Sequence, residues 1–270
     1  MQEATQDSVE RRYRARLRLL QMHYEAGVGH IGGNLSALDI LLALYHDVMG
    51  QDDQFILSKG HAAGALYITL WSVGRLGDHD LQTFHKDRTL LAGHPPARGL
   101  EDVLFATGSL GHGLSLAAGL ALAKQLRGEP GRVFCLMSDG EWNEGSNWEA
   151  LLFAHHQGLS NLTLIVDQNG LQGFGTTHEV ADLHPLADKF RAFRVPTVEI
   201  DGHEDDALQR ALFDQHGAPN AIVAETQKGR GVSYMEDRME WHYLPMTAQQ
   251  YEQARAEVEQ TCATSFASRS

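Results

Sequence analysis

The sequence predicts an α/β fold in which a doubly wound, mostly parallel sheet carries helices on both faces. Short apolar runs recur along the chain, and longer segments with a helical period separate them. Apolar runs without polar alternation are typical of strands covered on both faces, and strands that alternate with helices imply parallel βαβ units. The 270 residues, 43% of them apolar, suffice for the core of such a domain.

The expected elements follow in chain order. A first helix over about residues 8–26 ends at Gly27, and a glycine-rich turn leads to a second helix that Ser36 is expected to cap, with Asp39 three residues on. Further helices are expected near 61–74, 113–126, 144–157, 185–193 and 204–214, and strands at 133–137, 162–166, 195–200 and 221–224. We expect one domain over residues 1–245, followed over 246–270 by a C-terminal helix, to about residue 260, and a tail.

Composition excludes several classes of protein. The formal net charge of −13 argues against a nucleic-acid binder, which would carry a basic patch. No apolar run approaches the ~20 residues of a membrane span, and the first residues lack the apolar stretch of a signal peptide. Two cysteines, Cys135 and Cys262, argue against a disulfide framework. We therefore expect a cytoplasmic protein without nucleic-acid or membrane partners, which holds any anionic ligand by a metal, backbone amides or a few cations.

Two polar side chains follow the ends of two expected strands. Asp139-Gly140 comes after the run 133–137, and Asn169-Gly170 follows the run 162–166. In doubly wound folds, ligands bind at these carboxyl ends. Asp139 offers Mg²⁺ a carboxylate, Asn169 offers an amide oxygen without further charge, and Gly140 allows the backbone to approach a diphosphate. Taken alone, the pair is equally compatible with two ordinary turns.

Further short motifs accompany this pair and decide between the two interpretations. They are GHIGG at 29–33, LSKGHAA at 57–63, GHP at 93–95, TGSLGHG at 107–113, SDGEWNEG at 138–145, DGH at 201–203, KGRG at 228–231 and EWH at 240–242. Together and in this order they are highly specific. Over nearly all of residues 8–245 the sequence resembles the transketolase family, in particular the separately encoded N-terminal half of split transketolases.

The resemblance implies thiamine diphosphate as the cofactor, bound with Mg²⁺ or with Ca²⁺ or Mn²⁺ in its place. It implies metal binding by Asp139, Asn169 and the main-chain oxygen of Leu171; cofactor binding by His61, Gly108, Leu110, Gly140, Glu144, Asn169, Lys228 and His242; and catalytic roles for His30, His61 and His94. Histidine suits such roles because its ordinary pKa allows proton transfer near neutrality.

The implied reaction is transfer of a two-carbon ketol unit from a ketose or ketose phosphate donor to an aldose acceptor. In the family, the glutamate that activates the cofactor and most sugar-phosphate contacts lie in a second domain, to which no segment of this sequence corresponds. A partner chain with the pyrimidine-binding and C-terminal domains is therefore expected to complete the site, in an α2β2 assembly.

Departures from the family pattern leave two alternatives. Gly173 stands where the family commonly has a larger side chain near the thiazolium, a space that Phe174 is expected to refill, and His112 stands where many members have glutamine. These departures leave room for a subunit of another thiamine diphosphate enzyme, either acyloin-forming or 2-oxo acid decarboxylating. A non-catalytic remnant that only binds a partner is disfavoured, because Asp139, Asn169 and the three motif histidines are intact.

Overall fold

A single parallel sheet organises the computed structural model, which describes residues 2–267. Within those residues it has five strands in the order β1-β2-β3-β5-β4, and every neighbouring pair is parallel. Their bounds are β1 Gln54–Leu57, β2 Val133–Ser138, β3 Leu162–Gln168, β4 Thr197–Asp201 and β5 Asn220–Glu225. The predicted fold class is thereby confirmed. β1 is not among the expected strands, because its apolar run is only Phe55-Ile56-Leu57.

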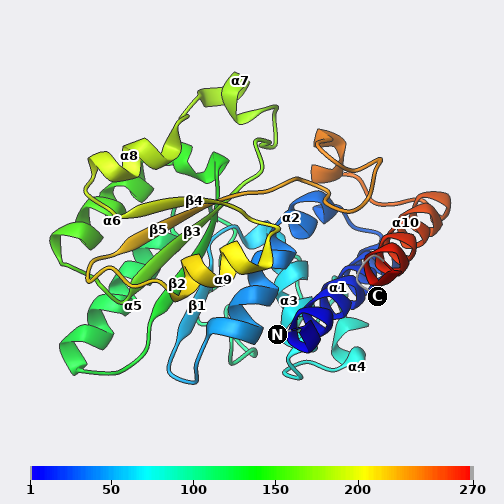
Figure 1. Cartoon of the computed structure of the whole chain (residues 1–270), viewed down its shortest axis with the longest axis horizontal. Helices are drawn as coiled ribbons and strands as arrows, with labels where there is room; N and C mark the ends of the chain where they lie inside the picture. The colour runs from blue at the N-terminus through cyan, green and yellow to red at the C-terminus, as the bar shows by residue number, and fades with distance from the viewer. Residues whose placement is uncertain (1, 268–270) are drawn as a thin grey trace.

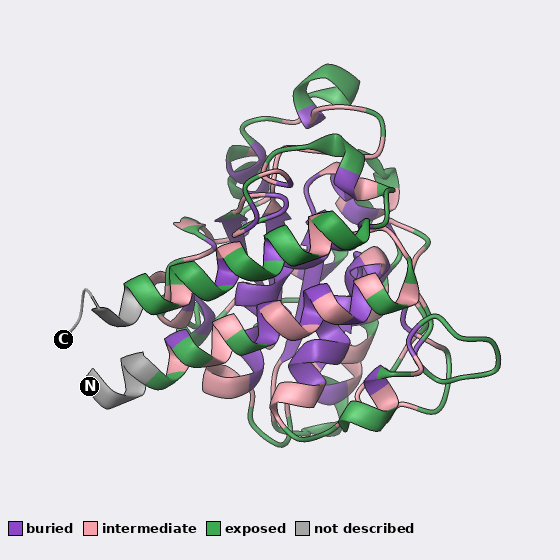
Figure 2. Ribbon diagram, turned by 90° about the vertical axis from the view of Figure 1, so that its right-hand side faces the viewer, coloured by how far each residue is buried: buried purple, intermediate pink, exposed green. Residues whose placement is uncertain are grey.

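Helices cover both faces of the sheet (Figure 1). One face carries α2 (Ile31–Ala43), α3 (Ala63–Ser72) and α9 (Asp205–Phe213), with α1 (Gln2–Ala26) packed outside α2 and α3. The other face carries α5 (Gly113–Arg127), α6 (Gly145–His156) and α8 (Leu186–Ala192). Two short helices, α4 (Asp78–Leu81) and α7 (Thr177–Ala181), lie in connecting segments. Figure 2 shows the buried residues concentrated in the sheet and the helices nearest to it.

Strand β2 illustrates why the apolar runs are continuous. Phe134 and Leu136 pack into the core on the α2 side, whereas Cys135 and Met137 pack into the core on the α5 side. All four side chains are fully buried. A strand covered on both faces needs an apolar residue at every position, since successive side chains point to opposite faces.

The amino end of α2 corrects one expectation. The helix begins at Ile31, after His30 with φ 65°, so the prediction that Ser36 caps it is wrong. Ser36 lies fully buried inside the helix. Gly32 and Gly33 lie inside the helix, although glycine commonly breaks helices. The neighbouring segment packs closely here and leaves little space for a side chain, since a Cβ on Gly32 would lie 3.1 Å from Cγ of Lys228. The packing of α2 against the 228–243 segment therefore overrides the turn signal.

The last helix, α10 (Ala248–Ala267), extends past the predicted end near residue 260 and packs along α1. The rings of Tyr24 and Tyr251 stack between the two helices, with centroids 4.4 Å apart. None of the described helices is long and apolar enough to cross a membrane. The division of the chain at residue 245 stays a prediction.

Candidate functional site

The carboxyl ends of β2 and β3 bring Asp139 and Asn169 together. The parallel register pairs Ser138 with Asp167, so Asp139 lies beside the chain that continues through Gln168 to Asn169. Oδ2 of Asp139 accepts a hydrogen bond from the amide of Gly170 (2.6 Å), and Oδ1 accepts one from the amide of Gly140 (2.7 Å). Oδ1 of Asn169 accepts one from the amide of Leu171 at 3.2 Å. One edge of the sheet therefore gathers the three expected metal ligands.

The charge of Asp139 favours a bound cation. Burial, together with the nearby Asp167 carboxylate, raises the pKa of Asp139 to about 6. Among the described residues, no lysine, arginine or histidine forms an ion pair with it. The nearby donors are a carboxylate, an amide oxygen and main-chain oxygens, which are the hard ligands that Mg²⁺ prefers. No group of three His, Cys, Asp or Glu side chains within residues 2–267 forms an alternative metal cluster.

Behind this edge, Asp167 is the centre of a buried polar network that the sequence did not predict. Its carboxylate forms an ion pair with Lys59, and both side chains are completely buried. It also accepts hydrogen bonds from Ser36 (2.7 Å), Thr226 and the side-chain amide of Asn169 (3.3 Å). Burial alone would raise the pKa of Asp167, but Lys59 and the hydrogen bonds outweigh it and lower that pKa. Asp167 therefore stays ionised and fixes the orientation of Asn169.

Four histidines from distant segments form a cluster beside this edge. The ring of His30 lies 5.9 Å from those of His61 and His94 and 5.4 Å from that of His242, measured between centroids. The rings of His61 and His242 are 5.5 Å apart. The amide of His30 also donates to the carbonyl of His242 at 3.1 Å. All three expected catalytic histidines are thus in one place.

These histidines are held neutral. Burial, and then the positive charge of Lys59, lowers the pKa of His61 well below its ordinary value. Burial followed by Lys228 lowers the pKa of His242 to about 3. Burial also lowers the pKa values of His30 and His94, with neighbouring histidines adding to the effect. A neutral imidazole has one nitrogen that accepts a hydrogen bond and one that donates, which suits contacts with hydroxyl groups.

Lys228 places a buried cation between the histidine cluster and the Asp139 edge. Its Nζ donates to Nδ1 of His242 at 3.0 Å and to the main-chain oxygen of Leu171 at 3.4 Å. The residue is only 2% exposed. Burial, with Lys59 adding to it, lowers the pKa of Lys228 to about 8. Its side chain therefore carries a positive charge at neutral pH in a place where a phosphate group would complement it.

The remaining expected cofactor residues are placed less uniformly. Gly108 has φ +137°, and a Cβ there would lie 2.8 Å from Cδ2 of His94, so this position needs glycine. A Cβ on Gly140 would lie 2.9 Å from Cγ of Gln172. Leu110 is half-buried, whereas Glu144 is exposed. Within the described residues, the side chain of Glu144 makes no hydrogen bond to the other expected site residues.

Glu141 is a site-supporting residue that sequence reasoning missed. Its side chain is fully buried and accepts hydrogen bonds from the hydroxyl of Ser58, from the amide of Gly111 (3.0 Å) and from the amide of Ser138 (3.3 Å). It thereby ties the ends of β1 and β2 to the loop that carries Gly108. Its place in the SDGEWNEG motif is the signal that could have drawn attention to it.

The expectation for Phe174 is wrong. Its side chain is 88% exposed and fills no space in the site. The hydroxyl of Tyr243 occupies the space beside Gly173 instead: it donates to the Gly173 carbonyl at 2.8 Å and would lie 2.4 Å from a Cβ at that position. The small residue at position 173 thus makes room for a tyrosine from the segment after η4 (Met239–His242).

A parallel α/β sheet whose strand ends gather a buried carboxylate, a buried lysine and neutral histidines is suited to binding a diphosphate-bearing cofactor. Residues 9–270 match the family model described as transketolase, thiamine diphosphate binding domain. The chain belongs to the transketolase family of transferases and carries its thiamine diphosphate-binding domain.

The relatives separate into two kinds by length. The chain is 39% identical to a subunit of the apulose-4-phosphate transketolase of Phocaeicola vulgatus, over 90% of both chains. It is 38% identical to the 6-deoxy-6-sulfo-D-fructose transketolase subunit SqwG of Clostridium sp. strain MSTE9, over 86% of this chain and 89% of that one. The crystal structure of Campylobacter jejuni transketolase superposes with a TM-score of 0.85 at 26% identity, but the match covers 94% of this chain and only 43% of that one.

Proposed function

We propose that this chain is the thiamine diphosphate-binding subunit of a split transketolase, which moves a two-carbon ketol unit from a ketose phosphate donor to an aldose acceptor. The observation that carries the proposal is the meeting of His30, His61 and His94 next to Lys228 and the Asp139 edge. This chain is similar to two transketolase subunits along almost their whole length, which supports the split arrangement.

In this proposal, Asp139, Asn169 and the carbonyl of Leu171 would hold a divalent cation, which would supply positive charge to offset that of the diphosphate. Asp139 would ionise fully when the cation binds, because the positive charge compensates the cost of its burial. Lys228 would supply a positive charge to the phosphate oxygens, and Gly140, whose amide donates to Oδ1 of Asp139, would let the backbone approach them. The Lys228 ammonium would exchange its contact with the Leu171 carbonyl (3.4 Å) for a charge-assisted hydrogen bond to phosphate.

The bound thiamine diphosphate supplies the electron sink for breaking and making the carbon–carbon bond. The chain's own contribution is to orient sugar hydroxyls and to move their protons. His30, His61 and His94 suit the orienting task because each neutral ring offers one nitrogen that accepts and one that donates a hydrogen bond to hydroxyl groups. Gly108, by leaving space for the ring of His94, sets where that ring stands.

A second chain completes the site in this proposal. The two relatives matched along their length are named as subunits, which implies a partner chain, and we propose an α2β2 assembly with a chain that carries the pyrimidine-binding and C-terminal domains. The relatives' names specify different sugars, so the proposal is limited to sugar or sugar-phosphate substrates.

The test is reconstitution. The purified chain is mixed with a candidate partner, thiamine diphosphate and Mg²⁺, and is supplied with ketose phosphates or, separately, with pyruvate. Ketol transfer from a ketose phosphate that needs both chains supports the proposal, and the Asp139→Asn variant serves as the inactive control. Turnover of pyruvate alone would favour the decarboxylating alternative, and cofactor binding without turnover of any donor would contradict the transketolase assignment.

A further inference from the structure

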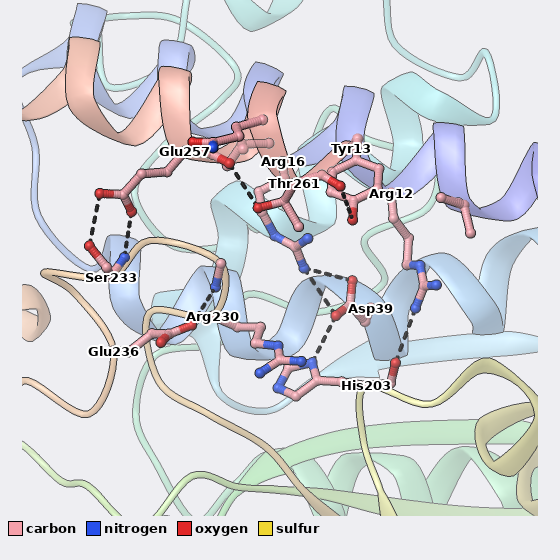
Figure 3. Close-up of a pocket in the computed structure, with 14 residues that line it drawn as sticks. Arg12, Tyr13, Arg16, Asp39, His203, Arg230, Ser233, Glu236, Glu257 and Thr261 are labelled. Carbon is pink, nitrogen blue, oxygen red and sulfur yellow. Dashed lines mark hydrogen bonds and ion pairs between the residues drawn. The ribbon is translucent and has the colours of Figure 1, made fainter. Parts of the chain in front are cut away.

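A second pocket lies apart from the cofactor site, between α1, α10 and the segment that follows β5 (Figure 3). Its volume is about 560 Å³, within the range of small-molecule sites. None of the residues expected to bind metal, cofactor or substrate lines it. Its polar lining comes from segments that are far apart in the sequence and includes Arg12, Arg16, Asp39, His203, Arg230 and Glu236.

Three arginines converge on this pocket, and two of them retain unused hydrogen-bonding capacity. Arg12 is paired with Asp205 at 2.9 Å. Arg16 binds both oxygens of Asp39 through Nη2 alone, at 3.0 and 3.1 Å, and its buried Nε has no hydrogen-bond partner within the described residues. Arg230 is exposed and forms no ion pair with a described carboxylate; its one hydrogen bond goes to a glutamine, Gln227, at 3.1 Å.

Of the three acids in the pocket wall, Asp39 is bound to Arg16, whereas Glu236 and Glu257 bind other groups. Glu236 accepts from the amide of Gly231 at 3.0 Å, and Glu257 accepts from the amide and hydroxyl of Ser233 at 2.7 and 2.8 Å. These carboxylates are therefore committed to the loop between β5 and α10. Guanidinium groups with free N–H donors bind phosphate and carboxylate groups in preference to other ligands.

A chain of hydrogen bonds connects the pocket to the cofactor site. Asp39, held by Arg16, also accepts from Nδ1 of His203 at 2.7 Å. Nε2 of His203 accepts from the amide of Gln227 at 2.9 Å, which leaves Nδ1 as the protonated nitrogen. Lys228 follows Gln227 in the chain. The amide of the next residue, Gly229, donates a hydrogen bond to the carbonyl of Gly32 at 3.0 Å. Arg230 and Lys228 thus lie on one turn, with Arg230 in the pocket and Lys228 in the cofactor site.

We propose that this pocket binds a small anion with a phosphate or carboxylate group, held by Arg16 and Arg230. Binding of the anion alters the contact between Lys228 and the cofactor. An anion that binds Arg16 competes with Asp39 for the same guanidinium. An anion that binds Arg230 shifts the turn that carries Lys228. The first movement reaches Lys228 through Asp39, His203 and the adjacent residue Gln227, and the second reaches it through the two residues of backbone from Arg230. By linkage, the cofactor and the anion then change each other's affinity. The coupling rests on the proposed function, whereas the anion site does not.

The binding test uses the full chain saturated with thiamine diphosphate and Mg²⁺, so that the diphosphate site is already filled. Inorganic phosphate and succinate are titrated separately by calorimetry, and the tighter of the two identifies the preferred group. Arg230→Ala is expected to weaken binding about tenfold or more, the loss of one charge-assisted pair. Arg210→Ala, which removes an exposed arginine of α9 outside the pocket, is expected to change nothing. Equal binding by both variants, or no binding of either probe, would overturn the site.

The coupling is tested by the release of radiolabelled thiamine diphosphate into an excess of unlabelled cofactor. A dissociation rate is insensitive to competition at the cofactor site, so a change reports the second pocket. With the saturating probe, the rate is expected to change about fivefold in the unaltered chain, at the lower end of typical coupling, and to stay constant in Arg230→Ala. An unchanged rate in both overturns the coupling. Neither measurement depends on ketol transfer, so failure of the proposed function is seen separately.

Discussion

The side-chain amide of Asn169 donates a hydrogen bond to Oδ1 of Asp167 at 3.3 Å. This contact turns the amide nitrogen away from the expected metal position and leaves its oxygen near the main chain of Leu171, 3.2 Å from that amide. Asp167 is itself fixed by Lys59, Ser36 and Thr226. A residue that touches neither metal nor cofactor in the proposal therefore sets the orientation of one that does.

Asp167→Asn is expected to lower the free energy of unfolding by about 3–5 kcal/mol, because it leaves the fully buried Lys59 without a counter-charge. Thr226→Val, the matched control, removes one hydrogen bond and leaves the ion pair, so a loss of about 1–3 kcal/mol is expected. Urea denaturation of the metal-free chain measures both. The interpretation fails if Asp167→Asn is no more destabilising than Thr226→Val.

Asp139→Asn should stabilise the metal-free chain in a pH-dependent way. The folded-state pKa of Asp139, about 6, lies above its ordinary value of 3.8, so folding favours the protonated form. Its contribution to stability is fully present below about pH 4 and is lost as the pH rises through 6. Asparagine does not titrate, so the stability difference in its favour should grow between about pH 4 and pH 7 in urea titrations.

Adding Mg²⁺ and thiamine diphosphate should reverse that order at pH 7, because a ligand that binds only the folded state stabilises it. The unaltered chain is then expected to gain stability, and Asp139→Asn to gain little. A stability difference that is independent of pH in the metal-free chain would contradict the buried, uncompensated carboxylate. Equal stabilisation of both chains by the ligands would contradict the metal assignment.

Lys228→Met is expected to raise the Kd for thiamine diphosphate about 10–100-fold, through loss of a charge-assisted hydrogen bond to phosphate. Since the pKa of Lys228 is lowered to about 8, the affinity of the unaltered chain should fall as the pH rises through 8, where the ammonium loses its proton. Lys189→Met on the surface of α8 is the control. Calorimetric titrations at several pH values measure these effects, and an identical pH profile in Lys228→Met would exclude this residue as the cause.

His94→Ala is expected to lower kcat of the two-subunit enzyme by about 10²–10⁴, the usual contribution of a proton-transferring side chain, with little change in cofactor affinity. His79→Ala, which removes an exposed histidine of α4, should leave kcat unchanged. Steady-state kinetics with a ketose phosphate donor, together with cofactor titrations, separate the two effects. A change confined to cofactor affinity would assign His94 to binding and not to the reaction.

Much of the fold could be predicted because the central strands β2, β3 and β5 are buried on both sides. The continuous apolar runs indicated four of the strands within the described residues, and the periodic segments between them indicated the main helices. β1 escaped because three apolar residues do not distinguish a strand from a buried turn. The start of α2 was misplaced because close packing against Lys228 and Trp241, which local sequence does not reveal, keeps Gly32 helical.

The residues of the candidate site also divide into those that the sequence could predict and those that it could not. Residues in specific motifs, such as His30, His94 and Asp139, could be expected at one sheet edge from the motifs and the topology. The partners of Asp167 could not, since Ser36 and Thr226 lie far from it in sequence and a single serine or threonine carries no signal of its contacts. That Tyr243, and not Phe174, fills the space beside Gly173 likewise depends on a contact between residues 70 positions apart in the sequence.

The Asp167 carboxylate also has a consequence for motion. Lys59 lies two residues past the end of β1, Asp167 is the penultimate residue of β3 and Thr226 follows β5, so one buried anion joins the ends of three strands. Opening any one of these ends would expose the Asp167 carboxylate or remove one of its partners, the Lys59 ammonium or the Thr226 hydroxyl. Amide hydrogens at the three strand ends should therefore exchange as one cooperative unit, and the framework behind the proposed cofactor site should open as a whole or not at all.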